Sequence, residues 1–254
     1  MIKTAIILAG GLGTRLRSAV GDLPKCMAPV NDFPFIAFVI AYLKKEGIGN
    51  FIFSLGYKSE AIINYVDATY KDLNKKYVIE TKQLGTGGAI KEACKSVEEK
   101  NVVVVNGDTL FAADISNLSK FHEGHTADCT IALKQMHNFD RYGAVELKED
   151  NLINAFNEKQ FCTIGLINGG VYTLMVSDLL SGNYPEVFSF EKEYLEKNTV
   201  TKKLYGVVND GYFIDIGIPE DYLRFQEDYK KVLTKNKYSV AGNKADEFIK
   251  GLIA

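Results

Sequence analysis

The sequence predicts one α/β domain built on a doubly wound, mostly parallel sheet. Short apolar runs alternate with helical stretches through the first half of the chain. This alternation is typical of βαβ units, in which helices cover both faces of a parallel sheet. The length of 254 residues and the hydrophobic content of 46% are sufficient for one sizeable core.

The first half is expected to contain four parallel strands, at residues 3–8, 51–55, 77–80 and 101–106. Apolar residues recur at helical spacing from Phe35 to Leu43, and Gly47 is expected just after that helix. Ser59 is expected to cap a second helix at 59–68, and a third helix is expected at 87–97. The four successive valines at 102–105 predict a strand in the centre of the sheet.

The second half is predicted to be partly antiparallel, because its apolar stretches are longer and the turns between them are short. Strands are expected at 127–134, 143–148, 152–156 and 166–174, with late strands at 207–208 and 213–215. A helix at 219–233 is expected to begin with Pro219 and to carry Glu220 and Asp221 in its first turn. Residues 235–243 are polar, and 244–253 are expected to form a terminal helix.

Three glycines follow the first strand, at positions 10, 11 and 13, and Arg15 and Lys25 come soon after. Glycines let backbone N–H groups approach an anion, and the two cations can hold phosphate oxygens. The segment is not a Walker loop, and Leu16 replaces the last glycine of a dinucleotide fingerprint. A tight turn with exposed charges is the alternative to the predicted polyphosphate site.

Asp108 and Asp215 each come at the end of a predicted strand, and a glycine lies close to each of them. In an open α/β sheet, ligands bind beyond the carboxyl ends of the strands. Two carboxylates from distant strands can hold Mg²⁺, which prefers oxygen ligands. Each aspartate alone could also be a turn or cap residue. Together they predict a magnesium site.

The composition excludes several kinds of partner. A formal net charge of −2 provides no basic field for nucleic acid. No apolar run reaches the ~18 residues of a membrane span, and no signal peptide is recognisable. Four cysteines without paired spacing predict a reducing compartment, the cytoplasm. Cys26 is expected to be a small buried residue, whereas His122, His125 and His137 are expected at the surface.

Six linked motifs then follow one another through nearly the whole chain. They are LAGGLGTRL at 8–16 with LPKCMAPV at 23–30, LGTGGA at 84–89, NGD at 106–108, EK at 158–159, NGGVY at 168–172 and DIGIPEDY at 215–222. With these motifs the chain resembles the sugar-1-phosphate nucleotidyltransferases, also called NDP-sugar pyrophosphorylases. The segments RLRS at 15–18 and VGDLPK at 20–25 most resemble the D-glycero-α-D-manno-heptose 1-phosphate guanylyltransferases.

The resemblance implies a Rossmann-like, GT-A-like fold with a nucleotide-binding half at about 1–125, an antiparallel sugar-binding half at about 126–234 and a tail at 235–254. The implied reaction is attack of a sugar 1-phosphate on the α-phosphorus of a nucleoside triphosphate, with loss of pyrophosphate. GTP and Mg²⁺ are the implied nucleotide and cofactor. The implied product is a GDP-heptose for capsule or surface polysaccharide, and a homodimer is one expected assembly.

The resemblance also implies a role for individual residues. Arg15, Lys25, Asp108 and Asp215 would be catalytic, with Lys25 as an exposed loop cation near the α-phosphate. The amide of Gln83 can pair with the edge of a base, although an exposed loop amide is the alternative. The implied nucleotide site consists of Leu8, Ala9, Gly10, Gly11, Gly13, Thr14, Arg15, Lys25, Gln83, Gly85 and Thr86. The implied sugar-phosphate site consists of Tyr142, Gly143, Glu158, Lys159, Asn168 and Gly169.

Cys26 and Gln160 each stand where relatives often have proline. Because Gln160 follows Lys159 directly, the turn at Lys159 is expected to be less rigid. Two other functions remain open at this point. One is another NDP-sugar pyrophosphorylase, such as a mannose-1-phosphate guanylyltransferase or a uridylyl-, cytidylyl- or thymidylyltransferase. The other is a non-catalytic regulator that binds nucleotide-sugars, which the intact set of Arg15, Lys25, Asp108, Lys159 and Asp215 disfavours.

Overall fold

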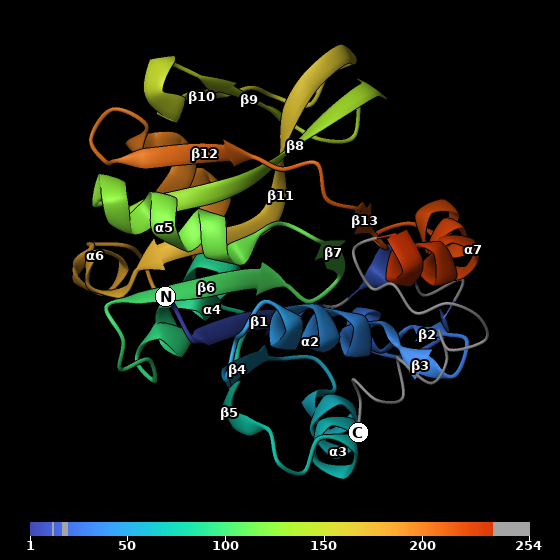
Figure 1. The fold of residues 1–254 in the computed structure, drawn as a ribbon. Helices are drawn as coiled ribbons and strands as arrows, with labels where there is room; N and C mark the ends of the chain where they lie inside the picture. The colour runs from blue at the N-terminus through green and yellow to red at the C-terminus, as the bar shows by residue number, and fades with distance from the viewer. Residues whose placement is uncertain (12, 17–19, 236–254) are drawn as a thin grey trace.

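A nine-stranded mixed sheet runs through the computed structural model, which describes residues 1–11, 13–16 and 20–235 (Figure 1). Four strands are parallel and adjacent in the order β6 (Asn101–Asn106), β1 (Thr4–Ala9), β4 (Asn50–Leu55) and β5 (Asn74–Ile79). They confirm the four strands expected in the first half, with the largest shift at β5. Because these strands are parallel, their carboxyl ends all lie at one edge of the sheet.

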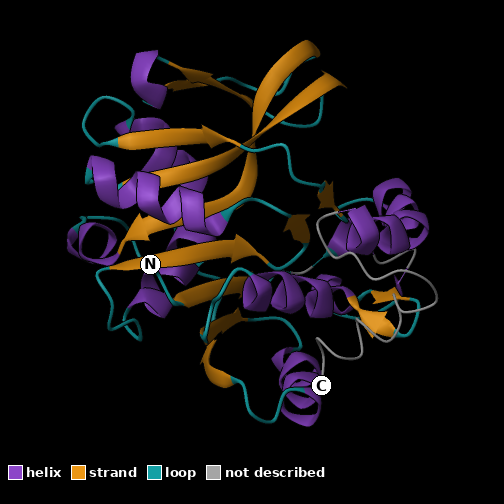
Figure 2. Ribbon diagram, in the orientation of Figure 1, coloured by secondary structure: helices purple, strands orange, loops and turns teal. Residues whose placement is uncertain are grey.

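Helices cover both faces of the parallel strands (Figure 2). Helices α2 (Phe35–Lys45), α3 (Ser59–Thr69) and α5 (Ile115–His125) share one buried cluster with Ile7 and Val105. Helices α4 (Gly85–Cys94) and α6 (Val176–Ser181) share the other cluster with Ile6 and Val104. Successive strand residues point to opposite faces, so one valine-rich strand supplies both clusters. The doubly wound architecture is confirmed.

The second half extends the sheet with mostly antiparallel strands. Strand β11 (Cys162–Met175) pairs antiparallel with β6 and also with β8 (Cys129–Phe139) and β9 (Ala144–Leu147). Strand β10 (Ile153–Phe156) pairs antiparallel with β9, whereas β12 (Leu204–Val208) runs parallel to β8. The register of β11 against β8 shifts between Asn168 and Tyr172. This bulge breaks the ladder at the NGGVY motif and leaves the side chains there free to line a cavity.

Two short ribbons stand apart from the main sheet. Strand β13 (Phe213–Asp215) pairs antiparallel with β7 (Thr109–Phe111), and β2 (Pro29–Val30) pairs with β3 (Phe33–Pro34). Helix α7 (Pro219–Lys235) follows β13 and packs on α2, where the Phe225 ring lies 5.2 Å from the rings of Phe35 and Phe38. The chain therefore returns from the second half to the edge of the first.

Several sequence expectations are wrong in detail. Ser59 does not cap α3; the cap residue is Lys58, which has a φ of 51° and gives no side-chain cap bond. Helix α4 begins at Gly85 and ends at Cys94, two residues earlier than expected at its start and three at its end. Helix α5 was not expected; its sequence is less apolar than those of α3 and α4. The terminal helix expected at 244–253 lies outside the described residues.

One of the three histidines expected at the surface is buried instead. His122 is 1% exposed on the inner side of α5, where its Nδ1 lies 3.0 Å from Thr130 Oγ1. Burial lowers the pKa of His122 to about 4. Asp221 is also buried, at 9% exposure, and it pairs with Arg141 and Arg224. Its carboxylate therefore contributes two ion pairs in addition to the expected interaction with the helix dipole. His125 and His137 are exposed as expected, and Cys26 is buried as expected.

Candidate active site

The glycine-rich loop leaves the carboxyl end of β1 and turns back toward Lys25. Gly13 has a φ of 59°, which favours glycine, and a Cβ there would lie 2.9 Å from the Cβ of Lys25. The chain then enters a single 3₁₀ turn, η1 (Thr14–Leu16), whose Leu16 is fully buried. Buried Leu16 anchors the turn, and the adjacent Arg15 stays exposed beside a cavity.

Asp108 and Asp215 come together although 107 positions separate them, since β13 pairs with β7 and brings Asp215 opposite Thr109. Lys25 lies between the two carboxylates. Its Nζ donates to Asp108 Oδ2 at 2.5 Å and to Asp215 Oδ1 at 3.3 Å. The Lys25 side chain is only 14% exposed, so the expectation of an exposed loop cation is wrong. Its charge is instead committed to an ion-pair cluster.

The two neighbouring carboxylates of this cluster are stabilised in their ionised form by nearby positive charge. Burial raises the pKa of the Asp215 carboxyl, and the negative charge of Asp108 raises it further. Lys25 and the backbone N–H of Gly217, which donates to Asp215 Oδ1 at 2.7 Å, oppose that rise. Two facing carboxylates are hard oxygen donors, so Asp108 and Asp215 are the residues that could hold a divalent cation. Within residues 1–11, 13–16 and 20–235, no group of three His, Cys, Asp or Glu side chains could hold a metal. The remaining ligands would have to come from water or substrate.

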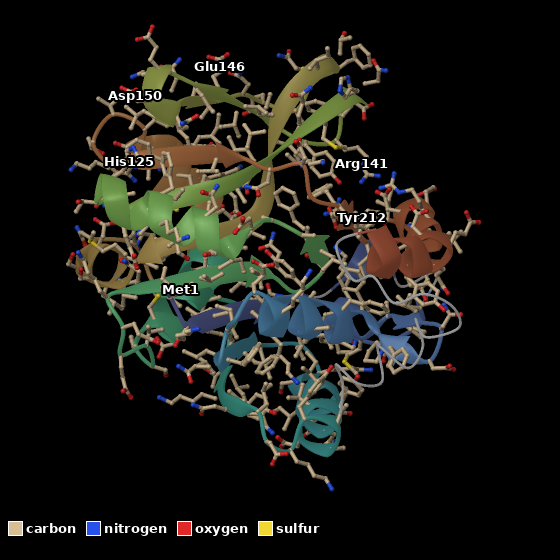
Figure 3. All side chains as sticks on the ribbon, viewed as in Figure 1. Met1, His125, Arg141, Glu146, Asp150 and Tyr212 are labelled. Atoms are coloured by element: carbon tan, nitrogen blue, oxygen red, sulfur yellow. The ribbon has the colours of Figure 1, made fainter. Side chains whose placement is uncertain are left out.

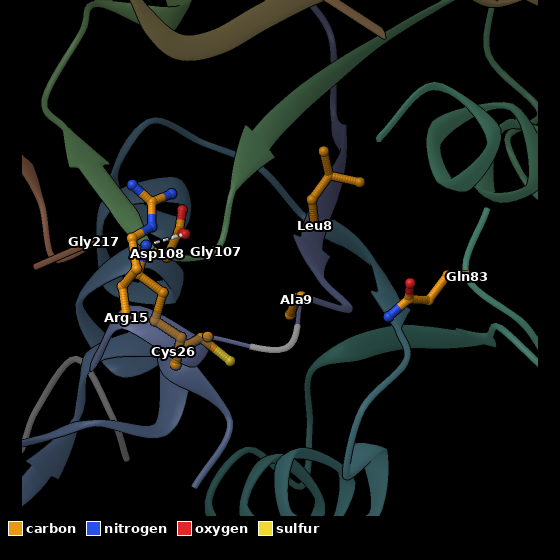
Figure 4. Close-up of a pocket in the computed structure, with 11 residues that line it drawn as sticks. Leu8, Ala9, Arg15, Cys26, Gln83, Gly107, Asp108 and Gly217 are labelled. Atoms are coloured by element: carbon orange, nitrogen blue, oxygen red, sulfur yellow. Dashed lines mark hydrogen bonds and ion pairs between the residues drawn. The ribbon is translucent and has the colours of Figure 1, made fainter. Parts of the chain in front are cut away.

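Three adjoining cavities meet at this cluster. The first, of about 330 Å³, we call the loop cavity; Figure 4 shows Arg15, Cys26 and Asp108 on one side of it and Gln83 on the other. The second, the Thr86 cavity, has a volume of about 420 Å³ and shares Gln83 and Asp108 with the loop cavity. The third, the Lys159 cavity, has a volume of about 510 Å³ and shares Arg15 with the loop cavity. We refer to these three adjoining cavities together as the cleft; Asp108 lines two of them and Asp215 lines the third.

Most of the residues expected from the sequence line this cleft. The loop and Thr86 cavities take those expected around the nucleotide: Leu8, Ala9, Gly10, Gly11, Gly13, Arg15, Lys25, Gln83, Gly85, Thr86 and Asp108. The Lys159 cavity takes those expected around the sugar phosphate, with the second acid: Tyr142, Gly143, Lys159, Asn168, Gly169 and Asp215. Glu158 is exposed and lines none of the three cavities, so its sugar contact stays a prediction. Thr14 lies in the turn beside the loop cavity.

A loop from the second half presses against the start of α4. Gly87 N donates to Phe188 O at 2.9 Å, and Phe188 N donates to Leu84 O at 2.9 Å. Gly85 has a φ of 71°, and a Cβ on it would lie 2.5 Å from Phe188 O. The LGTGGA motif therefore needs its glycines for close approach to another part of the chain, in addition to any contact with a ligand. We call this pair of contacts between Phe188 and residues 84–87 the latch. It joins the second half of the chain to the first.

Sequence reasoning missed several residues that line or brace the cleft. Arg141 donates to Asp221 Oδ2 at 2.5 Å and to the Tyr142 hydroxyl at 3.1 Å, which places it beside α7 (Figure 3). Its place directly before Tyr142 was the available signal. Four further lining residues are Glu80, Asn106, Tyr172 and Glu191. Asn106 and Tyr172 stood inside recognised motifs, whereas nothing in the local sequence marked Glu80 or Glu191.

Cys26 is 3% exposed and borders the loop cavity, and burial raises the pKa of its thiol to about 12. A thiol that stays protonated is a poor nucleophile, so its contribution is packing.

Comparison with known proteins agrees with this geometry. The nucleotidyl transferase family profile matches residues 4–232. The chain is 48% identical over 224 residues to a D-glycero-alpha-D-manno-heptose 1-phosphate guanylyltransferase of Aneurinibacillus thermoaerophilus, covering 88% of this chain and 97% of that protein. It is also 48% identical over 221 residues to the Campylobacter jejuni protein of the same name, covering 87% and 97%.

A solved structure, HddC from Yersinia pseudotuberculosis complexed with GMP-PN, superposes with a TM-score of 0.81 at 36% identity. The match covers 90% of this chain and all of that one. Profile, sequence and fold thus agree over nearly the whole chain. The chain belongs to the nucleotidyl transferase family.

Proposed function

We propose that this protein transfers a guanylyl group from GTP to D-glycero-α-D-manno-heptose 1-phosphate, giving a GDP-heptose and pyrophosphate. The observation that carries the reaction type is the cluster of Lys25, Asp108 and Asp215 where the three cavities meet. The names of the two relatives at 48% identity support the choice of base and sugar.

The chemistry of such a transfer is mainly electrostatic. The attacking phosphate oxygen is already an anion, so no general base is required. The attacking oxygen must approach the α-phosphorus in line, although both substrates are polyanions. The protein therefore has to position the two substrates and stabilise their negative charge. Arg15 in the loop and Lys25 beside the acids would grip the triphosphate, and Lys159 across the cleft would grip the acceptor phosphate. Mg²⁺ held by Asp108 and Asp215 would neutralise charge on the reacting phosphates.

The base preference tests the proposal directly. Pyrophosphate release should be measured with GTP, ATP, UTP, CTP and dTTP, each paired with heptose 1-phosphate and mannose 1-phosphate. GTP should exceed every other triphosphate by about tenfold or more in kcat/KM, because a wrong base leaves buried polar groups unpaired. Gln83→Ala should erode this preference more than it slows the reaction with GTP. A better rate with UTP or CTP would overturn the guanylyl assignment but leave nucleotidyl transfer standing.

Lys159 offers a second test, on the acceptor side. It is exposed at the Lys159 cavity and has no ion pair among the described residues, so its charge is available. Lys159→Ala should raise KM for the sugar 1-phosphate and lower kcat, because the phosphate it holds carries the attacking oxygen. KM for GTP should stay nearly unchanged. Lys148→Ala, which removes an exposed lysine near the end of β9, is the matched control. A defect confined to GTP would move Lys159 out of the acceptor site.

Other pyrophosphorylases remain the second candidate, since the sugar is set by hydroxyl contacts within the Lys159 cavity. The substrate panel separates them, and a complete absence of turnover would favour a nucleotide-sugar-binding regulator. We infer a cytoplasmic location from the four free cysteines. No helix within the described residues is long and apolar enough to cross a membrane. We also propose that the GDP-heptose product supplies capsule or surface polysaccharide, as the resemblance to the guanylyltransferases implies. A homodimer stays a prediction, which light scattering tests.

A further inference from the structure

Glu191 occupies a position that the reaction described above does not use. It lies in the first turn of the π-helix η4 (Phe190–Leu195), directly after the loop that presses on α4. Glu191 lines both the Thr86 cavity and the Lys159 cavity. Asn106 is the other residue that these two cavities share. A carboxylate therefore stands at the junction between the two cavities.

One oxygen of this carboxylate is fully engaged by the protein. The hydroxyl of Thr86 donates to Glu191 Oε2 at 2.7 Å, and the hydroxyl of Ser189 lies 2.9 Å from the same oxygen. The Thr86 hydroxyl also accepts from the backbone N–H of Phe190 at 2.8 Å. The donor that holds Glu191 is thus itself fixed by the latch. Such a supported side chain is pre-organised, because little rotamer freedom remains to be lost on binding.

The second oxygen, Oε1, receives no hydrogen bond from any residue within 1–11, 13–16 and 20–235. Thr86, on the nucleotide side, already occupies Oε2, so Oε1 is the oxygen that remains available to a ligand. The residues near Glu191 on that side are polar. After burial, the charge of Glu191 is the strongest influence that raises the pKa of the Tyr172 hydroxyl, and Asn168 donates to that hydroxyl at 3.0 Å.

The charge of Glu191 limits what it can bind. The phosphates of both substrates are anions, and a carboxylate repels them. A neutral hydroxyl, by contrast, donates a strong charge-assisted hydrogen bond to a carboxylate. The Lys159 cavity is lined by Lys159 and Arg141, with Arg15 at its boundary with the loop cavity, so cations are available there for the phosphate. Within it, Glu191 is suited to the part of the acceptor that carries hydroxyls and no charge.

We propose that Glu191 Oε1 accepts a hydrogen bond from a hydroxyl group of the acceptor sugar, and that Glu191 is a specificity-determining residue for that sugar. The proposal rests on the proposed sugar 1-phosphate chemistry of the Lys159 cavity. Thr86 and Ser189 act as positioning residues that hold the carboxylate. Glu191 thereby connects recognition of the sugar to the contacts between residues 188–190 and the start of α4.

The test uses Glu191→Gln and Glu191→Ala in the whole protein. The probes are heptose 1-phosphate, its single-deoxy analogues, GTP and 2′-deoxy-GTP. Both variants should raise KM for the sugar 1-phosphate, and KM for GTP should change by less than about twofold. In the wild type, one deoxy analogue should lose about tenfold to a hundredfold in kcat/KM, the effect of losing a hydrogen bond to a charged group. Glu191→Ala should show no further loss with that same analogue.

The control is Glu186→Gln, an exposed acid on the same loop that pairs with Lys82; it should leave both KM values unchanged. The proposal is wrong if every deoxy analogue costs the wild type and Glu191→Ala equally. A loss of discrimination against 2′-deoxy-GTP would assign Glu191 to the ribose instead. An equal rise in both KM values with a lower Tm would make it a purely structural part of the latch. If the wild type transfers no nucleotide to any sugar 1-phosphate, the proposed function itself is wrong, and the role assigned to Glu191 is wrong as a consequence.

Discussion

Asp215→Asn and Asp108→Asn should each lower kcat by about 10³-fold and raise the Mg²⁺ concentration needed for half-maximal activity. A carboxamide is neutral and a poor ligand for a hard cation. A catalytic cation contributes several kcal/mol of transition-state stabilisation, and each 1.36 kcal/mol is a factor of ten in rate. The effect is expected to be the largest of any single substitution, because the two carboxylates line the adjoining cavities proposed for the two substrates.

Loss of fold can be separated from loss of activity at these positions. Burial and the charge of Asp108 disfavour the ionised form of Asp215, so a neutral amide at position 215 removes that penalty. The Tm of Asp215→Asn should therefore equal or exceed that of the wild type. Asp210→Asn, at an exposed position shortly before β13, is the matched control and should keep full activity. An unchanged Mg²⁺ dependence in either site variant would exclude that aspartate as a ligand.

The parallel strands could be predicted because their signal is local. Four successive valines before Asn106 can only be buried on both faces, and such a run is typical of a central parallel strand. The carboxyl end of that strand then places Asp108 at the ligand edge. For Asp215 the local pattern showed a short strand end and a motif, but not which strand would bring it to Asp108. The pairing of β13 with β7 is a contact between three-residue strands distant in sequence, and such pairings depend on the whole fold.

Long-range burial explains the other errors. Lys25 stands in a glycine- and proline-rich stretch that has the composition of an exposed loop. It is buried by carboxylates 83 and 190 residues away, which no local pattern can indicate. Glu191 follows a loop without periodicity, and its partner Thr86 lies 105 residues earlier. His122 is buried because α5 packs against the sheet, and the low apolar content of α5 gave no sign of that packing.

Replacement of Lys25 by methionine, which keeps the length of the side chain and removes the charge, should lower kcat by about 10²–10³-fold. This is the usual loss when one preorganised electrostatic contact is removed from a transition state. The ammonium group lies within hydrogen-bond distance of the carboxylates of Asp108 and Asp215, so it is close to any phosphate that a cation on those carboxylates would hold. Near-normal turnover would contradict a catalytic role for Lys25.

Stability provides an independent readout for the same variant. Without Lys25, two carboxylates face each other across a partly buried site with no countercharge, and like charges in that setting destabilise the fold. Lys25→Met should therefore have a lower Tm than the wild type in the absence of Mg²⁺. Added Mg²⁺ should restore part of the difference, because a ligand that binds only the folded state stabilises it. Lys58→Met, which removes an exposed lysine paired with Asp22, is the control and should show neither the rate loss nor the Mg²⁺-dependent recovery. Equal Tm values for Lys25→Met and the wild type in metal-free buffer would show that Lys25 is not the countercharge of the two acids.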